Sequence, residues 1–101
     1  MEAPWRATKK LAAVVVRGRS MEPEFHDGDI IFYEEPNSYD PEKLVGRTVV
    51  VRTEDGRTYV KRLLRGSKPG LWDLESHAAP PVHDVRIVWV APIRYIERAE
   101  P

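Results

Sequence analysis

The chain has 101 residues and a formal net charge of zero, which fits one domain with a modest core and argues against direct nucleic acid binding. It contains no cysteine, so disulfides, thiolate catalysis and cysteine zinc sites are excluded. The three histidines have no close His-x-x-x-His spacing, and we expect no metal and no cofactor. No apolar run approaches the roughly 20 residues of a membrane span, so we expect a cytoplasmic protein without membrane contact.

Proline and glycine interrupt the chain at short intervals, and the segments between them are rich in β-branched residues. This pattern predicts an all-β, compact domain of short strands and hairpins, with few or no helices. We expect a single domain over residues 1–101, with its core at about 11–97. The expected strands are 11–17, 30–33, 47–53, 58–64, 71–76, 86–91 and 93–98.

The connections between these strands also have recognisable sequences. Asp55-Gly56 predicts a hairpin between the two central strands, because glycine readily adopts the positive φ of a tight turn. Residues 37–41 are expected to form a loop, followed by a short helical turn near 41–45. The pair His83-Asp84 follows two prolines, and we expect it in a loop as well.

A serine stands directly after the first expected strand. Residues 16–23 read VRGRSMEP, so a strand runs into Gly18 and Ser20 follows in a turn. Such a turn lifts the Ser20 hydroxyl out of the sheet, and the apolar Met21 is expected to pack beneath it. Taken alone, this segment is only a turn that contains a serine.

A lysine stands in the middle of the expected strand 58–64. On a strand, Lys61 shares one face with Tyr59 and Leu63, and burial there would lower the pKa of its amine. A neutral lysine can accept the proton of a serine hydroxyl and so activate it as a nucleophile. The opposite face also mixes a basic residue with apolar ones, so periodicity alone leaves open whether Lys61 is buried or solvated.

Three segments resemble those of a known peptidase family. Residues 16–32, VRGRSMEPEFHDGDIIF, resemble the nucleophile segment of the LexA, UmuD and phage-repressor peptidases. Residues 56–64, GRTYVKRLL, resemble the lysine segment of the same proteins, which signal peptidases share. Residues 74–77, LESH, followed by prolines, resemble the family's Leu-x-Ser-x-Asn segment but lack the asparagine. The resemblance extends over about residues 11–97.

The resemblance implies a LexA- and signal-peptidase-like β fold and a serine endopeptidase with a Ser–Lys dyad. Ser20 would attack a peptide carbonyl, and Lys61 would accept its proton and then protonate the leaving amine. Backbone N–H groups near Ser20 would hold the oxyanion, so Arg19 and Met21 are the residues expected at the oxyanion site and pocket. The substrate would be a peptide or protein, cleaved in trans or within a longer regulator that contains this domain.

Two other functions and one other catalytic mechanism stay open. One function is that of a soluble peptidase that processes precursors, although the chain shows no anchor that would bring it to a membrane substrate. The chain could be a non-catalytic dimerisation module of a transcriptional repressor that retains an inactive dyad, with a homodimer contact on strands 86–91 and 93–96. A Ser-His-Asp triad would need one of the three histidines, but the chain has no Gly-x-Ser-x-Gly segment. The resemblance also implies a role in transcription regulation such as the SOS response, with a RecA-like co-protease as a further partner.

The segment before Ser20 bears on self-cleavage. LexA-like proteins are cut at an Ala-Gly or Cys-Gly bond, and neither dipeptide occurs among residues 1–19. We therefore expect that this chain does not cut itself. Whether it is a stand-alone protein or the peptidase part of a longer regulator stays open.

Overall fold

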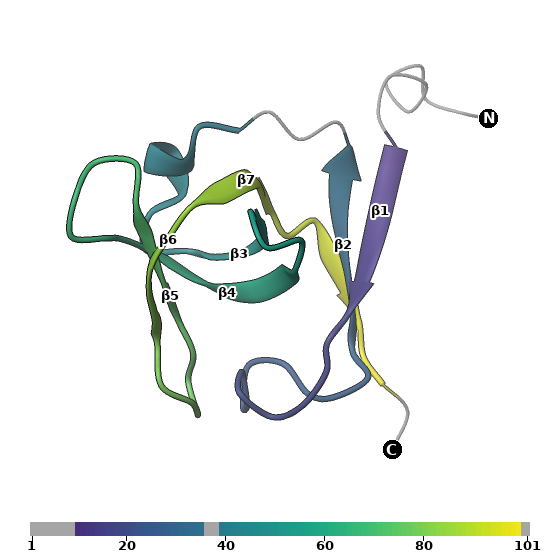
Figure 1. The fold of residues 1–101 in the computed structure, drawn as a ribbon. Helices are drawn as coiled ribbons and strands as arrows, with labels where there is room; N and C mark the ends of the chain where they lie inside the picture. Colours follow the sequence, from purple (N-terminus) through teal and green to yellow (C-terminus); the bar gives the residue numbers. More distant parts are fainter. Residues whose placement is uncertain (1–9, 36–38, 100–101) are drawn as a thin grey trace.

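The computed structural model describes residues 10–35 and 39–99, which form two antiparallel sheets (Figure 1). The smaller sheet has the strand order β1-β2-β8, and the larger has the order β6-β5-β4-β3-β7. The strands are β1 (Lys10–Val15), β2 (Ile30–Glu35), β3 (Thr48–Thr53), β4 (Thr58–Arg65), β5 (Trp72–Glu75), β6 (Val82–Val85), β7 (Ile87–Pro92) and β8 (Tyr95–Glu97). A short 3₁₀ helix, η2 (Pro41–Leu44), precedes β3. No helix of the described residues is long and apolar enough to cross a membrane.

The all-β fold expected from the sequence is confirmed, and the expected strands form with ends shifted by no more than two residues. The β3–β4 hairpin turns through Gly56, whose φ of 88° is one that glycine adopts without strain. The expected helical turn forms as η2, where an Asp40 carboxylate oxygen accepts a hydrogen bond of 3.0 Å from the Glu42 N–H. The expected loop at 37–41 lies partly outside the described residues.

The expectation of a loop at His83-Asp84 is wrong, because both residues belong to β6, which pairs with β5. The carboxylate of Asp73 in β5 lies 2.9 Å from His83 Nδ1 and accepts a hydrogen bond of 2.8 Å from the Asp84 N–H. β6 is an exposed strand at the edge of its sheet. Polar cross-strand contacts therefore replace the apolar alternation by which a strand is recognised in a sequence.

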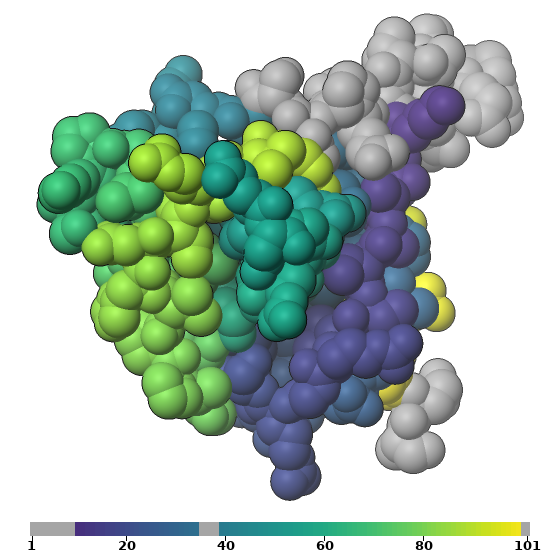
Figure 2. Space-filling view, in the orientation of Figure 1, coloured from purple at the N-terminus to yellow at the C-terminus, as the bar shows by residue number. Residues whose placement is uncertain are grey.

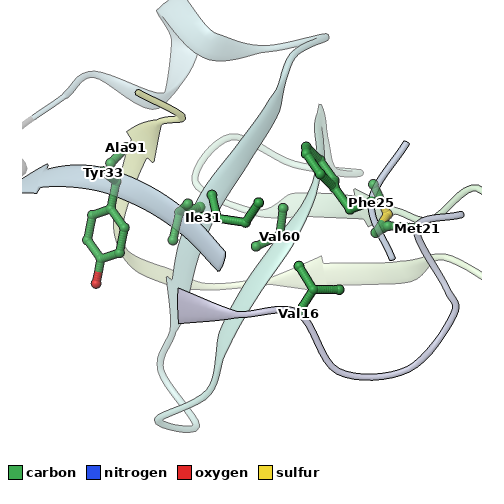
Figure 3. Packing of buried hydrophobic residues seen from close by; sticks show 8 residues of the cluster. Val16, Met21, Phe25, Ile31, Tyr33, Val60 and Ala91 are labelled. Atoms are coloured by element: carbon green, nitrogen blue, oxygen red, sulfur yellow. The ribbon is translucent and has the colours of Figure 1, made fainter. Parts of the chain in front are cut away.

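The space between the two sheets is filled by an apolar cluster, called here the inter-sheet cluster (Figure 3). The smaller sheet and the loop after β1 contribute five of its eight buried residues, and β3, β4 and β7 contribute one each. Its buried residues are Val16, Met21, Phe25, Ile31, Tyr33, Val50, Val60 and Ala91. Met21 and Phe25 are each only 2% exposed, so the loop that contains Ser20 is held by the core itself.

The other face of the larger sheet is covered by a second cluster. Its buried residues are Leu44, Val49, Val51, Leu63, Trp72, Leu74 and Val90. Since side chains alternate along a strand, Val50 faces the inter-sheet cluster while Val49 and Val51 face the second one. β3 is therefore buried on both faces, which explains its uninterrupted run of valines. The middle of the neighbouring strand β4 is buried on both faces as well.

Candidate active site

Ser20 and Lys61 meet where the turn after β1 reaches β4. Ser20 lies in the turn after β1, and Lys61 lies within β4, 41 residues further along the chain. Lys61 Nζ donates a hydrogen bond of 3.2 Å to Ser20 Oγ. The turn follows a strand of the smaller sheet, whereas Lys61 lies in the larger sheet, so this contact exists only in the folded chain.

The loop that presents Ser20 spans residues 16–29 and is called here the Ser20 loop. Gly18 has a φ of 81°, and its N–H donates a hydrogen bond of 2.7 Å to the Asp27 carboxylate on the far side of the loop. Two backbone hydrogen bonds of 2.8 Å close the base of the loop, from Val16 N–H to Asp29 C=O and from Gly28 N–H to Val16 C=O. The backbone around Ser20 is therefore fixed at both ends.

Asp29 is a buried charge at the base of this loop, with only 1% of the residue exposed. Burial alone would raise the pKa of its carboxyl group. Hydrogen bonds from the backbone N–H groups of Ala99 and His26 and from the Arg98 guanidinium outweigh burial and lower the pKa to about 2. An ionised Asp29 thus ties the Ser20 loop to the residues that follow β8.

Lys61 is buried on the face of β4 that it shares with Tyr59 and Leu63, which answers the question that periodicity left open. The residue is 9% exposed, and its amine lies 5.8 Å from the centre of the Tyr59 ring. Lys61 also lines an open pocket. Burial lowers the pKa of the Lys61 amine below its usual value of 10.5.

Ser76 is a third member of the site, and no role was expected for it from the sequence. Lys61 Nζ donates a hydrogen bond of 2.6 Å to Ser76 Oγ. Glu75, the last residue of β5, pairs with Arg62 in β4, so the next residue in the register faces Lys61. The Leu-x-Ser segment of the family together with this hairpin register would have identified Ser76.

A pocket of about 230 Å³ opens beside the serine and the lysine. In Figure 2 it lies between the purple residues of β1 and the teal end of the β3–β4 hairpin. Its lining comes from β1 and the Ser20 loop on one side and from β4 on the other. The lining residues are Val14, Val15, Val16, Arg17, Ser20, Met21, Thr58, Tyr59, Val60 and Lys61.

Both strands beside the pocket have an unpaired edge among the described residues. β1 pairs with β2 alone. Residues 58–61 of β4 pair with β3 on one side, whereas β5 pairs with β4 only from Arg62 onward. The wall of the pocket therefore contains backbone N–H and C=O groups of both strands that no neighbouring strand occupies.

Of Arg19 and Met21, the two residues expected at the oxyanion site and pocket, only Met21 lines the pocket. Met21 lines the pocket and is buried. The Arg19 side chain is 85% exposed, lies 3.4 Å from Glu22 and does not line the pocket. Arg17 does line it, although nothing in the sequence distinguished this arginine from a solvated one.

Of the histidines, His77 contacts Glu24 and His83 contacts Asp73.

One comparison with known proteins gave a match. The family model described as Peptidase S24-like matches residues 1–87, a stretch that includes Ser20, Lys61 and Ser76. No curated protein and no solved structure matches the chain. The matched stretch covers most of the chain, and the all-β fold agrees with a LexA- and UmuD-like domain. The chain therefore belongs to the peptidase S24-like family.

Proposed function

We propose that the chain is a serine endopeptidase in which Ser20 is the nucleophile and Lys61 its general base. The observation that carries the proposal is the 3.2 Å contact between Ser20 Oγ and a lysine amine whose pKa burial has lowered. Serine is a weak nucleophile unless a neighbouring base removes its proton, and a lysine can act as that base only when it is neutral. Membership of a peptidase family supports the same assignment.

In the proposed reaction, neutral Lys61 takes the proton from the Ser20 hydroxyl while Oγ forms a bond to the carbonyl carbon of the substrate. The C–N bond then breaks, and Lys61 gives the proton to the leaving amine. Water next attacks the acyl ester, with Lys61 accepting one water proton, and Ser20 Oγ leaves with that proton. Enzyme groups end in their starting state, and one peptide bond has been hydrolysed.

Ser76 would orient the base during this reaction. Its hydroxyl accepts a hydrogen bond of 2.6 Å from Nζ, which keeps the amine beside Ser20. The oxyanion would be held by backbone donors of the Ser20 loop. The N–H group of Ser20 donates to no other described residue, so it is available to a substrate carbonyl.

The pocket favours an extended peptide as the substrate. A segment between β1 and residues 58–61 of β4 would satisfy the unpaired backbone groups on both sides, as in recognition by strand addition. Half of the lining is apolar, with Val14, Val16 and Val60 among these residues, so small or apolar side chains next to the cleaved bond fit best. Such a peptide would come from a longer regulator that contains this domain or from a partner protein cleaved in trans.

The test is cleavage of a peptide library that includes Ala-Gly bonds flanked by apolar residues, followed between pH 7 and 10 by mass spectrometry. The proposal predicts discrete cuts by the wild-type chain and none by Ser20→Ala. Equal cutting by both proteins would assign the activity to a contaminant, and the absence of any cut by the wild type at all pH values would overturn the proposal.

A non-catalytic dimerisation module is a second candidate, favoured by one specific observation. Val88 in β7 is 62% exposed and Tyr95 in β8 is 53% exposed, and both lie on the segments expected to form a homodimer contact. Analytical ultracentrifugation of the wild type and of Val88→Asp tests this candidate. It requires a dimer that the substitution dissociates, in a protein that cuts no peptide.

A further inference from the structure

Three consecutive residues, 76–78, each contact a different part of the site, and they are called here the bridging segment. Ser76 Oγ accepts from the Lys61 amine at 2.6 Å. His77 Nε2 lies 2.7 Å from a carboxylate oxygen of Glu24. The Ala78 N–H donates a hydrogen bond of 2.8 Å to the backbone C=O of Ser20. The bridging segment thus contacts the lysine, the serine and the loop that contains the serine.

Glu24 is held on several sides in the Ser20 loop. The oxygen that contacts His77 also accepts a hydrogen bond of 3.2 Å from the Thr48 hydroxyl at the start of β3. The backbone C=O of Glu24 accepts a hydrogen bond of 2.9 Å from the Arg98 guanidinium. The His77–Glu24 contact therefore links the end of β5 to a residue in the middle of the Ser20 loop that Thr48 and Arg98 also hold.

Such a connection matters because no β-ladder joins the two halves of the site. Ser20 follows β1 of the smaller sheet, whereas Lys61 and Ser76 belong to the larger sheet or follow it directly. Their separation depends on core packing, on the backbone hydrogen bond from Ala78 to Ser20, and on side-chain contacts such as that of His77 with Glu24. A shift of about 1 Å between reacting groups can lower a rate by two orders of magnitude, so a contact that sets this separation affects turnover directly.

We propose that His77 and Glu24 are positioning residues that hold the Ser20 loop against the end of β5 and thereby set the distance between Ser20 and Lys61. The inference rests on the proposed function, and neither residue lines the pocket. It predicts an effect on turnover rather than on substrate binding, because the pocket is lined by other residues.

The kinetic test compares His77→Ala, His77→Gln and Glu24→Ala with the wild type on a cleaved library peptide. His77→Ala and Glu24→Ala should lower kcat by roughly tenfold to a hundredfold with KM little changed. His77→Gln should recover most of the rate, because its amide can still donate to Glu24. His83→Ala is the matched control, since it removes a similar histidine–carboxylate contact of 2.9 Å, to Asp73, away from the site.

A second readout does not depend on activity. Amide hydrogen exchange at Ala78 reports whether its hydrogen bond to Ser20 opens, and it should be about fivefold faster in His77→Ala, with β3 and β4 amides unchanged. If the wild type cuts no peptide, the proposed function fails and Ala78 exchange alone decides the positioning role. Unchanged kcat in His77→Ala, or unchanged Ala78 exchange, or a His77→Gln protein as slow as His77→Ala, would overturn the inference.

Discussion

The hydroxyl of Ser76 lies 2.6 Å from the Lys61 amine, closer than the hydroxyl of Ser20 at 3.2 Å. The amine therefore has two hydroxyl neighbours in unlike positions. Ser20 lines the pocket and can meet a substrate, whereas Ser76 does not line it and is free to keep its hydrogen bond to Nζ throughout a reaction. This difference supports the assignment of Ser20 as the nucleophile and Ser76 as the residue that orients the base.

Removing the Ser76 hydroxyl should slow turnover without unfolding the protein. Ser76 is partly exposed, so Ser76→Ala leaves no unfilled core volume. We expect a fall in kcat of about tenfold, which corresponds to the loss of one charge-assisted or strongly oriented hydrogen bond. Ser76→Thr, which retains the hydroxyl, should recover part of the rate. Steady-state kinetics with a cleaved library peptide would measure both, and equal kcat values for wild type and Ser76→Ala would refute this role.

Replacing Lys61 should separate activity from stability. Lys61→Met should be inactive at every pH. At pH 7 its free energy of unfolding should equal that of the wild type or exceed it by up to about 1 kcal/mol, because the substitution removes the desolvation cost of a buried ammonium. Because the lysine pKa is lowered in the folded protein, the desolvation cost applies in full at pH values below that lowered pKa. The cost disappears as pH rises toward 10.5, where the unfolded chain also loses its proton. Urea unfolding at pH 7 and at pH 10.5 measures the difference, which should shrink at the higher pH.

Arg62→Ala is the matched control for Lys61→Met. Arg62 is the next residue of β4, lies on the opposite face, is exposed and contacts Glu75 at 3.7 Å. Its removal should leave peptide cleavage intact and change stability by less than about 1 kcal/mol. Loss of cleavage in Arg62→Ala would mean that any change in β4 disables the site, and the effect of Lys61→Met would then not identify a base.

Asp29 should make the Ser20 loop sensitive to acid. Its pKa is lowered from 3.8 to about 2, so its stabilising contribution is complete above about pH 3.8 and is lost as pH falls toward 2. Asp29→Asn should therefore reduce the free energy of unfolding by about 2 kcal/mol at pH 7, with a smaller deficit near pH 2. Denaturant unfolding of both proteins across this pH range tests the point. A deficit that is constant with pH would contradict an ionised, hydrogen-bonded Asp29.

The parts of this architecture that local sequence determines could be predicted. The β3–β4 hairpin follows from Asp55-Gly56 between β-branched runs, and Ser20 and Lys61 stand in short segments with recognisable chemistry. Ser76 was missed because its approach to Lys61 depends on the β4–β5 register, which the sequence of the intervening loop 66–71 does not determine. β6 was missed because polar contacts to Asp73 stabilise it instead of an apolar face.

The face of β4 that is buried also could not be predicted from the sequence. Both faces of this strand mix basic and apolar residues, and Val60 and Lys61 turn out to be buried on opposite faces. Only the packing of the Ser20 loop and the end of β5 around the amine explains why a lysine is tolerated there. Long-range arrangement of this kind has no local signal in the chain.

The pH dependence of peptide cleavage tests the central claim, that neutral Lys61 is the base for Ser20, most directly. Because burial lowers the lysine pKa below 10.5, kcat should rise with pH through that lowered pKa and level off beneath the value for a solvated lysine. Lys61→Arg should be inactive throughout, since a guanidinium does not lose its proton in this range. A wild-type rate that does not rise with pH, or a Lys61→Arg protein that cleaves as fast as the wild type, would contradict the account.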